Sequence, residues 1–348
     1  MMNEGSGKSA NDGARTVLLS HTRAALALYY GDEALARLRA VVEVRTVDSD
    51  TELSLPELIE RAAGCDIVVS FRATTAPREL FAGLPQLLAF VRCAVDIRNV
   101  DVAAASEHGV LVTHASAGFV SSVVEWTLGA MIDLSRDLTA STLAWRAGTA
   151  PPPRLGRTLR GSTLGLIGFG RIARELAGIA LALGMHVVVA DPYSRSDDER
   201  IVSCDLDALL GRADFVVCLA VASAQTENLM DAAAFARMKP GAFFVNPSRG
   251  NLVDDDALLA ALDTGRIAGC ALDVGRDADQ MPSLRLALHP CCIATPHVGG
   301  LTRAAIDHQA FETVTQVVTI LRGDMPSGAA NGDADGLRFR ARATSAGG

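Results

Sequence analysis

Short apolar runs alternate with amphipathic segments along most of the chain, and this alternation predicts the fold class. In the first third, the runs predict strands at residues 16–20, 41–45, 67–71, 89–93 and 110–113. Helical patterns lie between them, for example at residues 33–39 and 56–63. Strands that alternate with helices are typical of parallel sheets covered by helices on both faces. We therefore expect an α/β domain here.

The same alternation returns after a break. A long amphipathic segment at residues 121–136 leads to the helix-breaking Pro151-Pro152-Pro153. Further strands are predicted at residues 164–168, 185–190, 215–219, 242–246, 268–274 and 292–294, and a last helix at residues 303–321. The pattern predicts two doubly wound parallel-sheet domains. Residues 1–14 and 326–348 lack an apolar pattern, and we expect them to be disordered.

Composition supports a soluble enzyme and excludes other classes. The 348 residues are 49% hydrophobic, enough for two cores. A net charge of −8 gives no basic surface, so neither nucleic acid nor an anionic membrane is an expected partner. No apolar run suits a membrane span or a signal peptide. The seven cysteines lie mostly in apolar runs, which favours reduced thiols in the cytoplasm, and no ligand spacing predicts a metal site.

The segment from Leu164 to Asp191 carries the most specific pattern. An apolar strand runs into Gly168-Phe169-Gly170, a helix pattern follows, and a second apolar strand ends at Asp191. This order is that of a dinucleotide-binding βαβ unit. Gly168 suits the tight turn, and Gly170 lets a pyrophosphate approach the backbone. Ala173 stands where the fingerprint has its third glycine.

The acid at the end of the second strand indicates which dinucleotide binds. The carboxylate of Asp191 would accept the ribose hydroxyls of NAD and repel the 2′-phosphate of NADP. The N–H groups at the start of the helix, at Arg171 and Ile172, would bind the pyrophosphate. NAD is therefore the expected cofactor.

Two residues at later strand ends are candidates for chemistry. Arg249 follows an apolar strand at a turn, where a guanidinium can hold a carboxylate through two parallel hydrogen bonds. His297 follows another strand, and imidazole can exchange a proton near neutral pH. A surface arginine in a turn and a solvated histidine are the alternative interpretations, and neither residue alone decides between them.

Three motifs together resemble one enzyme family. Residues 246–254 read Asn-Pro-Ser-Arg-Gly-Asn-Leu-Val-Asp, residues 271–274 read Ala-Leu-Asp-Val, and Thr295-Pro296-His297 follows. In order and near-usual spacing they resemble the D-isomer-specific 2-hydroxyacid dehydrogenases. The resemblance covers residues 16–325 and raises Arg249 and His297 above other candidates.

The resemblance implies an NAD-binding Rossmann domain at residues 119–299 and a flavodoxin-like substrate domain built from residues 15–118 and 300–325, usually in a homodimer with the active site in the cleft. It implies hydride exchange between NAD and a D-2-hydroxy or 2-oxo acid, with Arg249 on the carboxylate and His297 as acid and base. The expected substrate-binding residues are Arg72, Ala73 and Thr74, and the expected cofactor-binding residues are Gly168, Gly170, Arg171, Ile172, Asp191, Pro247, Asp273, Gly299 and Gly300.

The chain departs from the family pattern at one position that bears on mechanism. Relatives place a Glu beside the catalytic His, five residues beyond the Asp of the Leu-Asp-Val motif, and this chain has Ala278 there. A carboxylate next to imidazole raises its pKa, and Asp277 or Asp279 could supply one after a small loop shift. The alternative is that both aspartates lie in a solvated loop.

Two further departures concern the surroundings of the site. The family's His-x-Pro is Leu219-Ala220-Val221, which predicts a more apolar nicotinamide wall. The family's glycine-rich turn reads Arg92-Cys93-Ala94, which predicts a bulkier, charged entrance. The resulting hypothesis is an NAD-dependent 2-hydroxyacid dehydrogenase with an unusual substrate. A non-catalytic NAD-binding scaffold or corepressor on the same fold is the alternative, and formate- or phosphite-type oxidation is a weaker one.

Overall fold

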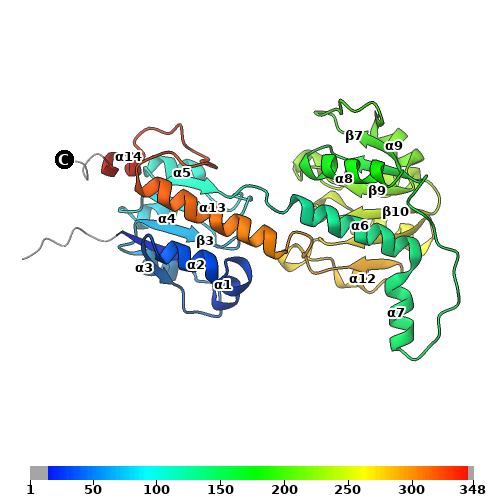
Figure 1. Cartoon of the computed structure of the whole chain (residues 1–348), viewed down its shortest axis with the longest axis horizontal. Coiled ribbons are helices and arrows are strands. Elements are labelled where there is room, and N and C mark those ends of the chain that lie inside the picture. Colours follow the sequence, from blue (N-terminus) through cyan, green and yellow to red (C-terminus); the bar gives the residue numbers. More distant parts are fainter. Residues whose placement is uncertain (1–14, 344–348) are drawn as a thin grey trace, which may run out of the picture. The chain divides into compact units, whose positions relative to one another are not determined.

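The computed structural model describes residues 15–343, except the side chains of Asp279 and of residues 341–343. These residues form two compact units (Figure 1). The first unit contains the chain up to Gly118 and again from Arg303 onward, and the second unit is Phe119–Thr302. Each unit has its own parallel sheet between layers of helices.

The first unit has, within the described residues, a five-stranded sheet in the order β2-β1-β3-β4-β5. This is the flavodoxin-like order, as the resemblance implied. The strands are β1 (Thr16–Leu19), β2 (Glu43–Thr46), β3 (Ile67–Ser70), β4 (Ala89–Arg92) and β5 (Leu111–His114). The helices are α1 (Arg23–Tyr29), α2 (Asp32–Arg39), α3 (Leu55–Ala62), α4 (Arg78–Gly83), α5 (Val102–Glu107), α13 (Arg303–Leu321) and α14 (Arg338–Ala343).

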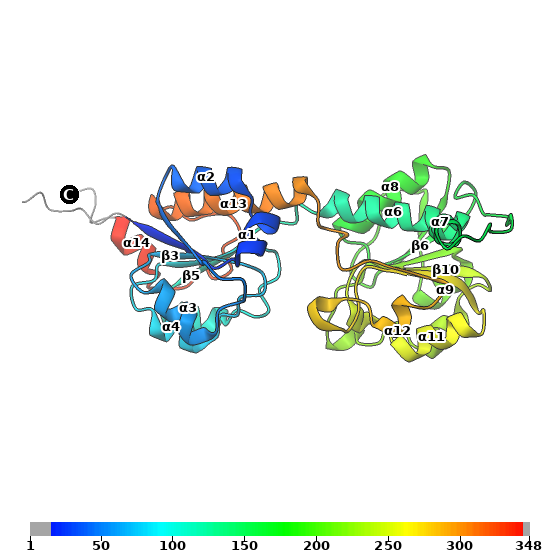
Figure 2. The ribbon, with the colours of Figure 1, turned by 90° about the horizontal axis from the view of Figure 1, so that it is seen from below.

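Alternate side chains of the inner strands of the first unit enter different cores. Val17 and Leu19 pack with α2 and α13 on one face, whereas Leu18 packs with α3 and α4 on the other. Figure 2 shows α2 and α13 on one side of this sheet and α3 and α4 on the opposite side. Because both faces are covered, β1, β3, β4 and β5 are buried along nearly their whole length, which is why their apolar runs were visible in the sequence. The edge strand β2 instead alternates exposed and half-buried residues.

The second unit has, within the described residues, a seven-stranded sheet in the order β12-β11-β10-β9-β6-β7-β8. The strands are β6 (Thr163–Ile167), β7 (His186–Ala190), β8 (Ile201–Ser203), β9 (Phe215–Cys218), β10 (Ala242–Asn246), β11 (Ile267–Leu272) and β12 (Cys292–Ala294). The helices are α6 (Val120–Arg136), α7 (Leu138–Arg146), α8 (Arg171–Ala182), α9 (Leu206–Arg212), α10 (Ala232–Arg237), α11 (Asp255–Asp263) and α12 (Leu284–Ala287). The strand order reverses between β6 and β9, and ligands of such sheets bind at this switch point.

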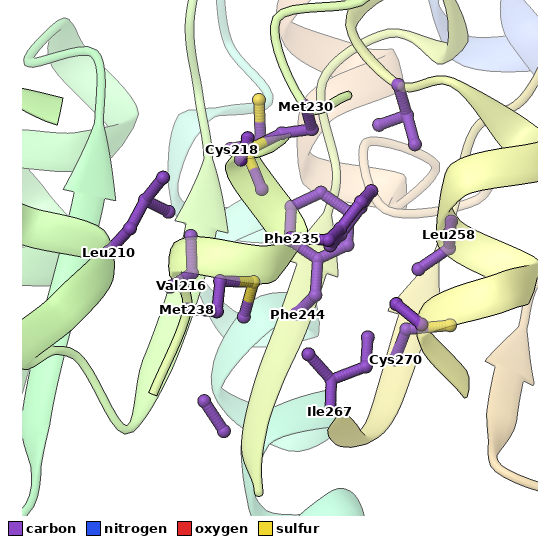
Figure 3. Packing of buried hydrophobic residues seen from close by; sticks show 14 of the residues in the cluster. Leu210, Val216, Cys218, Met230, Phe235, Met238, Phe244, Leu258, Ile267 and Cys270 are labelled. Carbon is purple, nitrogen blue, oxygen red and sulfur yellow. The ribbon is translucent and has the colours of Figure 1, made fainter. Parts of the chain in front are cut away.

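Helices cover both faces of the second sheet. α6 and α8 pack on one face, while α9, α10 and α11 pack on the other (Figure 2). In the second of these cores, the rings of Phe235 and Phe244 meet edge to face at 5.4 Å between centroids (Figure 3). Met230, Met238 and Cys270 lie in the same core as these rings. The predicted class of two doubly wound parallel-sheet domains is confirmed.

Most predicted elements lie within two residues of the observed ones, and short exposed elements are the exceptions. The sequence pattern missed β8, which has three residues, two of them exposed. It also missed α7, none of whose residues is buried. An element that buries little apolar surface leaves little periodicity to detect.

The prediction of disorder was wrong for residues 326–343. Leu337 and Phe339 are buried in the core beside α13. Ala329 bridges Thr113 of the edge strand β5, and the side chain of Asn331 accepts from Val112 N at 2.8 Å and donates to Val110 O at 2.9 Å. The segment therefore covers the edge of the sheet, where unpaired backbone groups would otherwise face solvent. Residues 1–14 and 344–348 lie outside the described residues.

The second boundary between the units lies slightly later than expected, after Thr302 instead of Gly299. The hydroxyl groups of Ser122 and Thr302 are hydrogen-bonded at 2.7 Å, which holds this segment to α6. A Cβ at Gly300 would lie 3.3 Å from Phe119 Cβ, so the chain also passes close to the start of α6. None of the helices within residues 15–343 combines the length and apolar character needed to cross a membrane.

We expect Asn331→Ala to lower the free energy of unfolding by about 1–3 kcal/mol, because the buried backbone groups of Val110 and Val112 would lose their partners. Urea unfolding followed by circular dichroism measures this change. The matched control is Gln225→Ala at an exposed position, with an expected change within about 0.5 kcal/mol. Equal stabilities of the two variants would show that the tail does not support the sheet.

Candidate functional site

The turn after β6 is shaped by Gly168. Its φ is +91°, in the region that favours glycine, and a Cβ there would lie 2.8 Å from the carbonyl oxygen of Leu219. Leu219 follows β9, the neighbour of β6 in the sheet. A side chain at Gly168 would therefore collide with the backbone across the switch point.

Gly170 lies at the start of α8 and leaves space there. Among the described residues, no atom other than those of Gly170 and its two chain neighbours lies within 4 Å of the place where its Cβ would be. No side chain caps this end of the helix, so the first N–H groups of α8, at Arg171 and Ile172, stay available to an external acceptor. Ala173 is fully buried and packs α8 against the sheet. The uncapped helix end and the open space beside it suit a phosphate group.

Asp191 follows β7 and holds the turn from the other side. Its Oδ2 accepts from the N–H of Phe169 at 2.7 Å, and its Oδ1 accepts from the N–H of Tyr193 at 2.7 Å and of Ser194 at 3.0 Å. The structure thus brings Gly168, Gly170 and Asp191 together at the carboxyl ends of β6 and β7, as their order in the sequence predicts.

Arg249 lies in a tight turn after β10. The side chain of Asn246 donates to the carbonyl of Arg249 at 2.9 Å, and its Oδ1 accepts from the N–H of Ser248 at 3.1 Å. Arg249 Nη1 donates to the Ser248 carbonyl at 2.7 Å, and the side chain is half-buried. Pro247 is buried in this turn. Asn246 therefore fixes the backbone that presents the guanidinium.

A second constraint on this turn comes from Gly250. A Cβ there would lie 2.0 Å from the carbonyl oxygen of Gly275, so the turn and the segment after β11 touch backbone to backbone. Arg276 strengthens this contact, because its Nε and Nη2 donate to the carbonyl of Val253 at 3.1 and 3.0 Å.

Asp273 follows β11 and holds the loop that carries His297. The carboxylate is 2% exposed. Its Oδ1 accepts from Thr295 Oγ1 at 2.6 Å and from Val298 N at 2.8 Å, and its Oδ2 accepts from Gly299 N at 2.7 Å. A Cβ at Gly299 would lie 2.7 Å from Oδ2, so only glycine leaves this bond undisturbed. These bonds give Asp273 a positioning role within the protein.

His297 lies at the crest of this loop. Its φ is +56°, uncommon for a residue other than glycine, and its side chain is half-buried. Such backbone persists only where the surroundings hold it, and it is frequent at functional sites. The bonds from Asp273 to residues on both sides of His297 supply that support.

Trp126 on α6 extends the support, and the sequence patterns did not single it out. Its indole Nε1 donates to Thr295 Oγ1 at 3.1 Å, and Thr295 in turn donates to Asp273. Trp126 is one of two tryptophans in the chain. Trp126 precedes the loop by more than a hundred residues, so no local pattern in the sequence indicates this contact.

The segment that replaces the expected Glu is a short turn after β11. Ala278 begins the 3-10 turn η3 (Ala278–Gln280), and Asp277 precedes it with an exposed side chain. The side chain of Asp279 lies outside the described residues. Gly275 N donates to the carbonyl of Gln280 at 2.7 Å, which closes the turn on itself.

The loop with Arg72, Ala73 and Thr74 follows β3 in the first unit. Thr74 Oγ1 is hydrogen-bonded to Ser20 Oγ at 2.8 Å, and Ser20 Oγ also accepts from Phe71 N at 3.1 Å. The guanidinium of Arg72 lies 4.9 Å from the ring centre of Tyr29, and Ala73 is exposed. Three consecutive candidate residues thus have three different environments.

The expectation of a charged entrance at Arg92 was wrong. The side chain is fully buried under the loop, where it donates to the carbonyl groups of Phe71 and Thr74 and to Asn99 Oδ1. The sequence could not reveal this, because an arginine at the end of an apolar strand is usually solvated.

The thiols show no sign of a metal centre. Within residues 15–343, no three His, Cys, Asp or Glu side chains are grouped so as to hold a metal ion. The pKa of Cys218 is raised to about 12 by burial, and a hydrogen bond with Cys292 together with burial raises the pKa of Cys270. These thiols are therefore protonated near neutral pH and belong to the core.

Comparison with known proteins agrees with these features. Residues 128–299 match the family profile described as D-isomer specific 2-hydroxyacid dehydrogenase, NAD binding domain. The chain is 36% identical over 265 residues to (S)-sulfolactate dehydrogenase of Chromohalobacter salexigens, which covers 75% of this chain and 86% of that protein. It is 34% identical over 290 residues to D-3-phosphoglycerate dehydrogenase 3 of Arabidopsis thaliana, which covers 82% of this chain.

The chain spans about half the length of that phosphoglycerate dehydrogenase, 49%. Among solved structures, the TT0316 protein of Thermus thermophilus superimposes with a TM-score of 0.82 at 30% identity, over 90% of this chain and 99% of that one. The predicted NAD-binding Rossmann domain is confirmed by the family match. On this evidence the chain belongs to the D-isomer-specific 2-hydroxyacid dehydrogenase family.

Proposed function

We propose that this protein is an NAD-dependent oxidoreductase that interconverts a D-2-hydroxy acid and the corresponding 2-oxo acid. The observation that carries the proposal is the arrangement of neighbouring strand ends in the second unit. β10, β11 and β12 are neighbours in the sheet, and Arg249, Asp273 and the loop of His297 follow them directly. Arg249, a cation that can bind a carboxylate, and His297, an imidazole that can exchange a proton, therefore follow strands of the same sheet that carries the dinucleotide-type turn at Gly168.

NAD fits the residues at the end of β6. The open space at Gly170 and the uncapped start of α8 suit the pyrophosphate, and Asp191 suits the ribose hydroxyls. Arg171, Ile172, Pro247, Gly299 and Gly300 are proposed to line the rest of the cofactor site. When bound, NADH supplies the hydride that reduces a carbonyl carbon.

Arg249 is proposed to bind the substrate carboxylate and to polarise the adjacent carbonyl group. A guanidinium does both, because its donors form a planar fork. His297 is proposed to donate a proton to the oxygen of the reduced carbonyl and to take that proton back in the oxidative direction. Asp273 holds the His297 loop, and we propose that the loop at residues 71–75, which contains Arg72, Ala73 and Thr74, offers backbone N–H groups to the carboxylate.

The acid partner of His297 is proposed to be Asp277 or Asp279. A carboxylate beside the ring stabilises the imidazolium and raises its pKa, so that the ring stays a competent acid at higher pH. Asp277 is exposed, and its side chain does not cap the short turn η3 that follows it.

The substrate class is proposed from the names of the relatives. The two enzymes named above act, by their names, on 3-phosphoglycerate and on sulfolactate, both 2-hydroxy acids with a second anionic group. A small 2-hydroxy acid is therefore proposed here, without preference for direction. The seven unpaired cysteines support a reducing compartment such as the cytoplasm.

A homodimer is proposed to form through α7. Leu138, Leu143 and Trp145 on this helix are 51%, 57% and 64% exposed, and Leu155 beyond it is fully exposed. Large apolar side chains that a helix leaves unburied are candidates for an interface. A second copy of the chain is the proposed partner.

Gly168→Ala and Gly170→Ala should separate folding from cofactor binding. Gly168→Ala is expected to cost about 1–3 kcal/mol of stability, since φ is positive and the Cβ meets backbone. Gly170→Ala should leave stability within about 0.5 kcal/mol of wild type but weaken NADH binding several-fold, because the new methyl group occupies the pyrophosphate path. Thermal unfolding and NADH fluorescence titration measure the two effects. Unchanged NADH affinity in Gly170→Ala would place the pyrophosphate elsewhere.

His297→Ala is expected to lower kcat about 10²- to 10⁴-fold, the usual contribution of a general acid. Arg249→Ala should lower kcat/KM about a hundredfold or more, because a charge-assisted contact to substrate is lost. NADH oxidation with glyoxylate, pyruvate and hydroxypyruvate, and NAD reduction with 3-phosphoglycerate and sulfolactate, provide the assays. NADH binding without turnover of any of these acids would favour the non-catalytic scaffold.

Asp277→Asn and Asp279→Asn identify the acid partner. The variant that removes the partner should shift the basic limb of the kcat/KM profile for reduction to lower pH, because the imidazolium loses its stabilising charge. The other variant serves as its control. Superimposable profiles for both variants and wild type would mean that neither aspartate acts on His297.

Leu143→Asp combined with Trp145→Asp should convert the protein to a monomer of 36.4 kDa, measured by light scattering after gel filtration. Charges placed within an apolar interface lose solvation without gaining partners. Leu28→Asp, at a side chain 51% exposed in the first unit, is the control and should leave the mass unchanged. A wild-type protein of monomer mass would exclude this interface.

A further inference from the structure

Arg92 is a buried cation placed directly under the loop after β3. It is the last residue of β4, it is 0% exposed, and it pairs in register with Ser70 at the end of β3. One guanidinium nitrogen, Nη1, donates to the carbonyl of Phe71, and Nη2 donates to the carbonyl of Thr74 at 2.8 Å. The two carbonyls at the ends of the loop are thus bound by one planar group.

Asn99 binds the same loop, and we call Arg92 and Asn99 together the clamp. Its Oδ1 accepts from Arg92 Nη2 at 2.7 Å, while its Nδ2 donates to the carbonyl of Arg72 at 3.2 Å and to that of Thr74 at 3.3 Å. Together, Arg92 and Asn99 hold three carbonyl groups of the loop on its inner side.

The direction of these carbonyls determines the direction of the next N–H groups. In a trans peptide, the C=O and N–H of one peptide plane point in opposite directions. With the Arg72 and Thr74 carbonyls held inward, the N–H groups of Ala73 and Thr75 are turned outward, and both of these residues are exposed. The N–H of Thr74, which lies between them, donates to the carbonyl of Phe71 at 3.1 Å. Two outward N–H groups on one loop form a site suited to an anion.

Within residues 15–343, no ion pair includes Arg92. Asp96 acts on its charge electrostatically and is itself paired with Arg98 at 2.6 Å. Burial lowers the pKa of Arg92 to about 10, so the guanidinium stays charged at neutral pH. Burial and Arg92 together lower the pKa of the neighbouring His21 to about 3, so that ring is neutral. A net positive charge therefore lies behind the loop.

We infer that Arg92 is a positioning residue for substrate binding, one that turns the Ala73 and Thr75 amides outward and places a buried positive charge behind them to attract the substrate carboxylate. The inference rests on the proposed function, in which this loop meets that carboxylate. Arg92 itself binds only protein groups, so it acts through the loop.

The loop has a second anchor that does not involve Arg92. Ser20 Oγ accepts from Phe71 N and is hydrogen-bonded to Thr74 Oγ1. A change at Arg92 should therefore loosen the loop without removing its attachment to β1 and β3.

Three variants separate the geometry from the charge. Arg92→Lys keeps the charge but loses the planar fork. Asn99→Ala and Asn99→Asp both lose the donor amide, and only Asn99→Asp neutralises the guanidinium. Arg78→Gln, at an arginine exposed and paired with Glu107, is the control for a general loss of positive charge in the same unit.

Hydrogen exchange tests the clamp without any activity. In the full chain, Arg92→Lys should speed amide exchange of residues 69–76 severalfold relative to wild type and Arg78→Gln. Unchanged exchange in Arg92→Lys would overturn the positioning role, whether or not the protein turns over a 2-oxo acid.

Steady-state kinetics tests the charge, with the 2-oxo acid of the panel above that wild type reduces best. Asn99→Asp should raise KM about tenfold over Asn99→Ala, with kcat within about twofold and NADH affinity unchanged. Equal KM values would overturn the electrostatic role. If wild type reduces none of the acids, the proposed function fails, and with it the substrate role of Arg92, while the exchange experiment still decides the clamp.

Discussion

The carboxylate of Asp273 is the constraint on which the candidate catalytic loop depends. It is almost fully buried, and both its oxygens accept hydrogen bonds from the loop after β12. Burying an ionised carboxylate is unfavourable unless hydrogen bonds replace its water. The loop supplies three such bonds, and in return the backbone at His297 is held at a positive φ. The carboxylate and the loop therefore order each other.

The hydrogen bonds between Asp273 and the His297 loop also depend on Trp126 and Gly299. The indole of Trp126 donates to Thr295, so that Thr295 can give its own proton to Asp273. Gly299 leaves room for the carboxylate oxygen that a Cβ would displace. A polar network in a buried place is stable only when each member has its partner. The same network thus links α6, β11 and the loop of His297.

The first unit uses the opposite charge in the same way. Arg92 is buried among carbonyl groups, and it orders the loop after β3 as Asp273 orders the loop after β12. The two loops differ in which backbone groups face the buried charge. A buried anion collects N–H groups around it, whereas a buried cation collects carbonyls and turns the N–H groups outward. A carboxylate under one loop therefore holds the backbone at His297, and a guanidinium under the other loop turns amides outward.

The sequence by itself determined the two parallel sheets, the turn at Gly168 and Gly170, and the family, because strands buried on both faces and a glycine-rich turn leave local patterns. Its errors came where the signal was not local. The tail was expected to be disordered, although Asn331 and Phe339 pack against distant parts of the first unit. Arg92 was expected at an entrance, although it is buried. Only the tertiary structure decided which partners meet the polar groups of Asp273, Arg92 and Asn331, because those partners lie far away along the chain and folding alone brings them within hydrogen-bond distance.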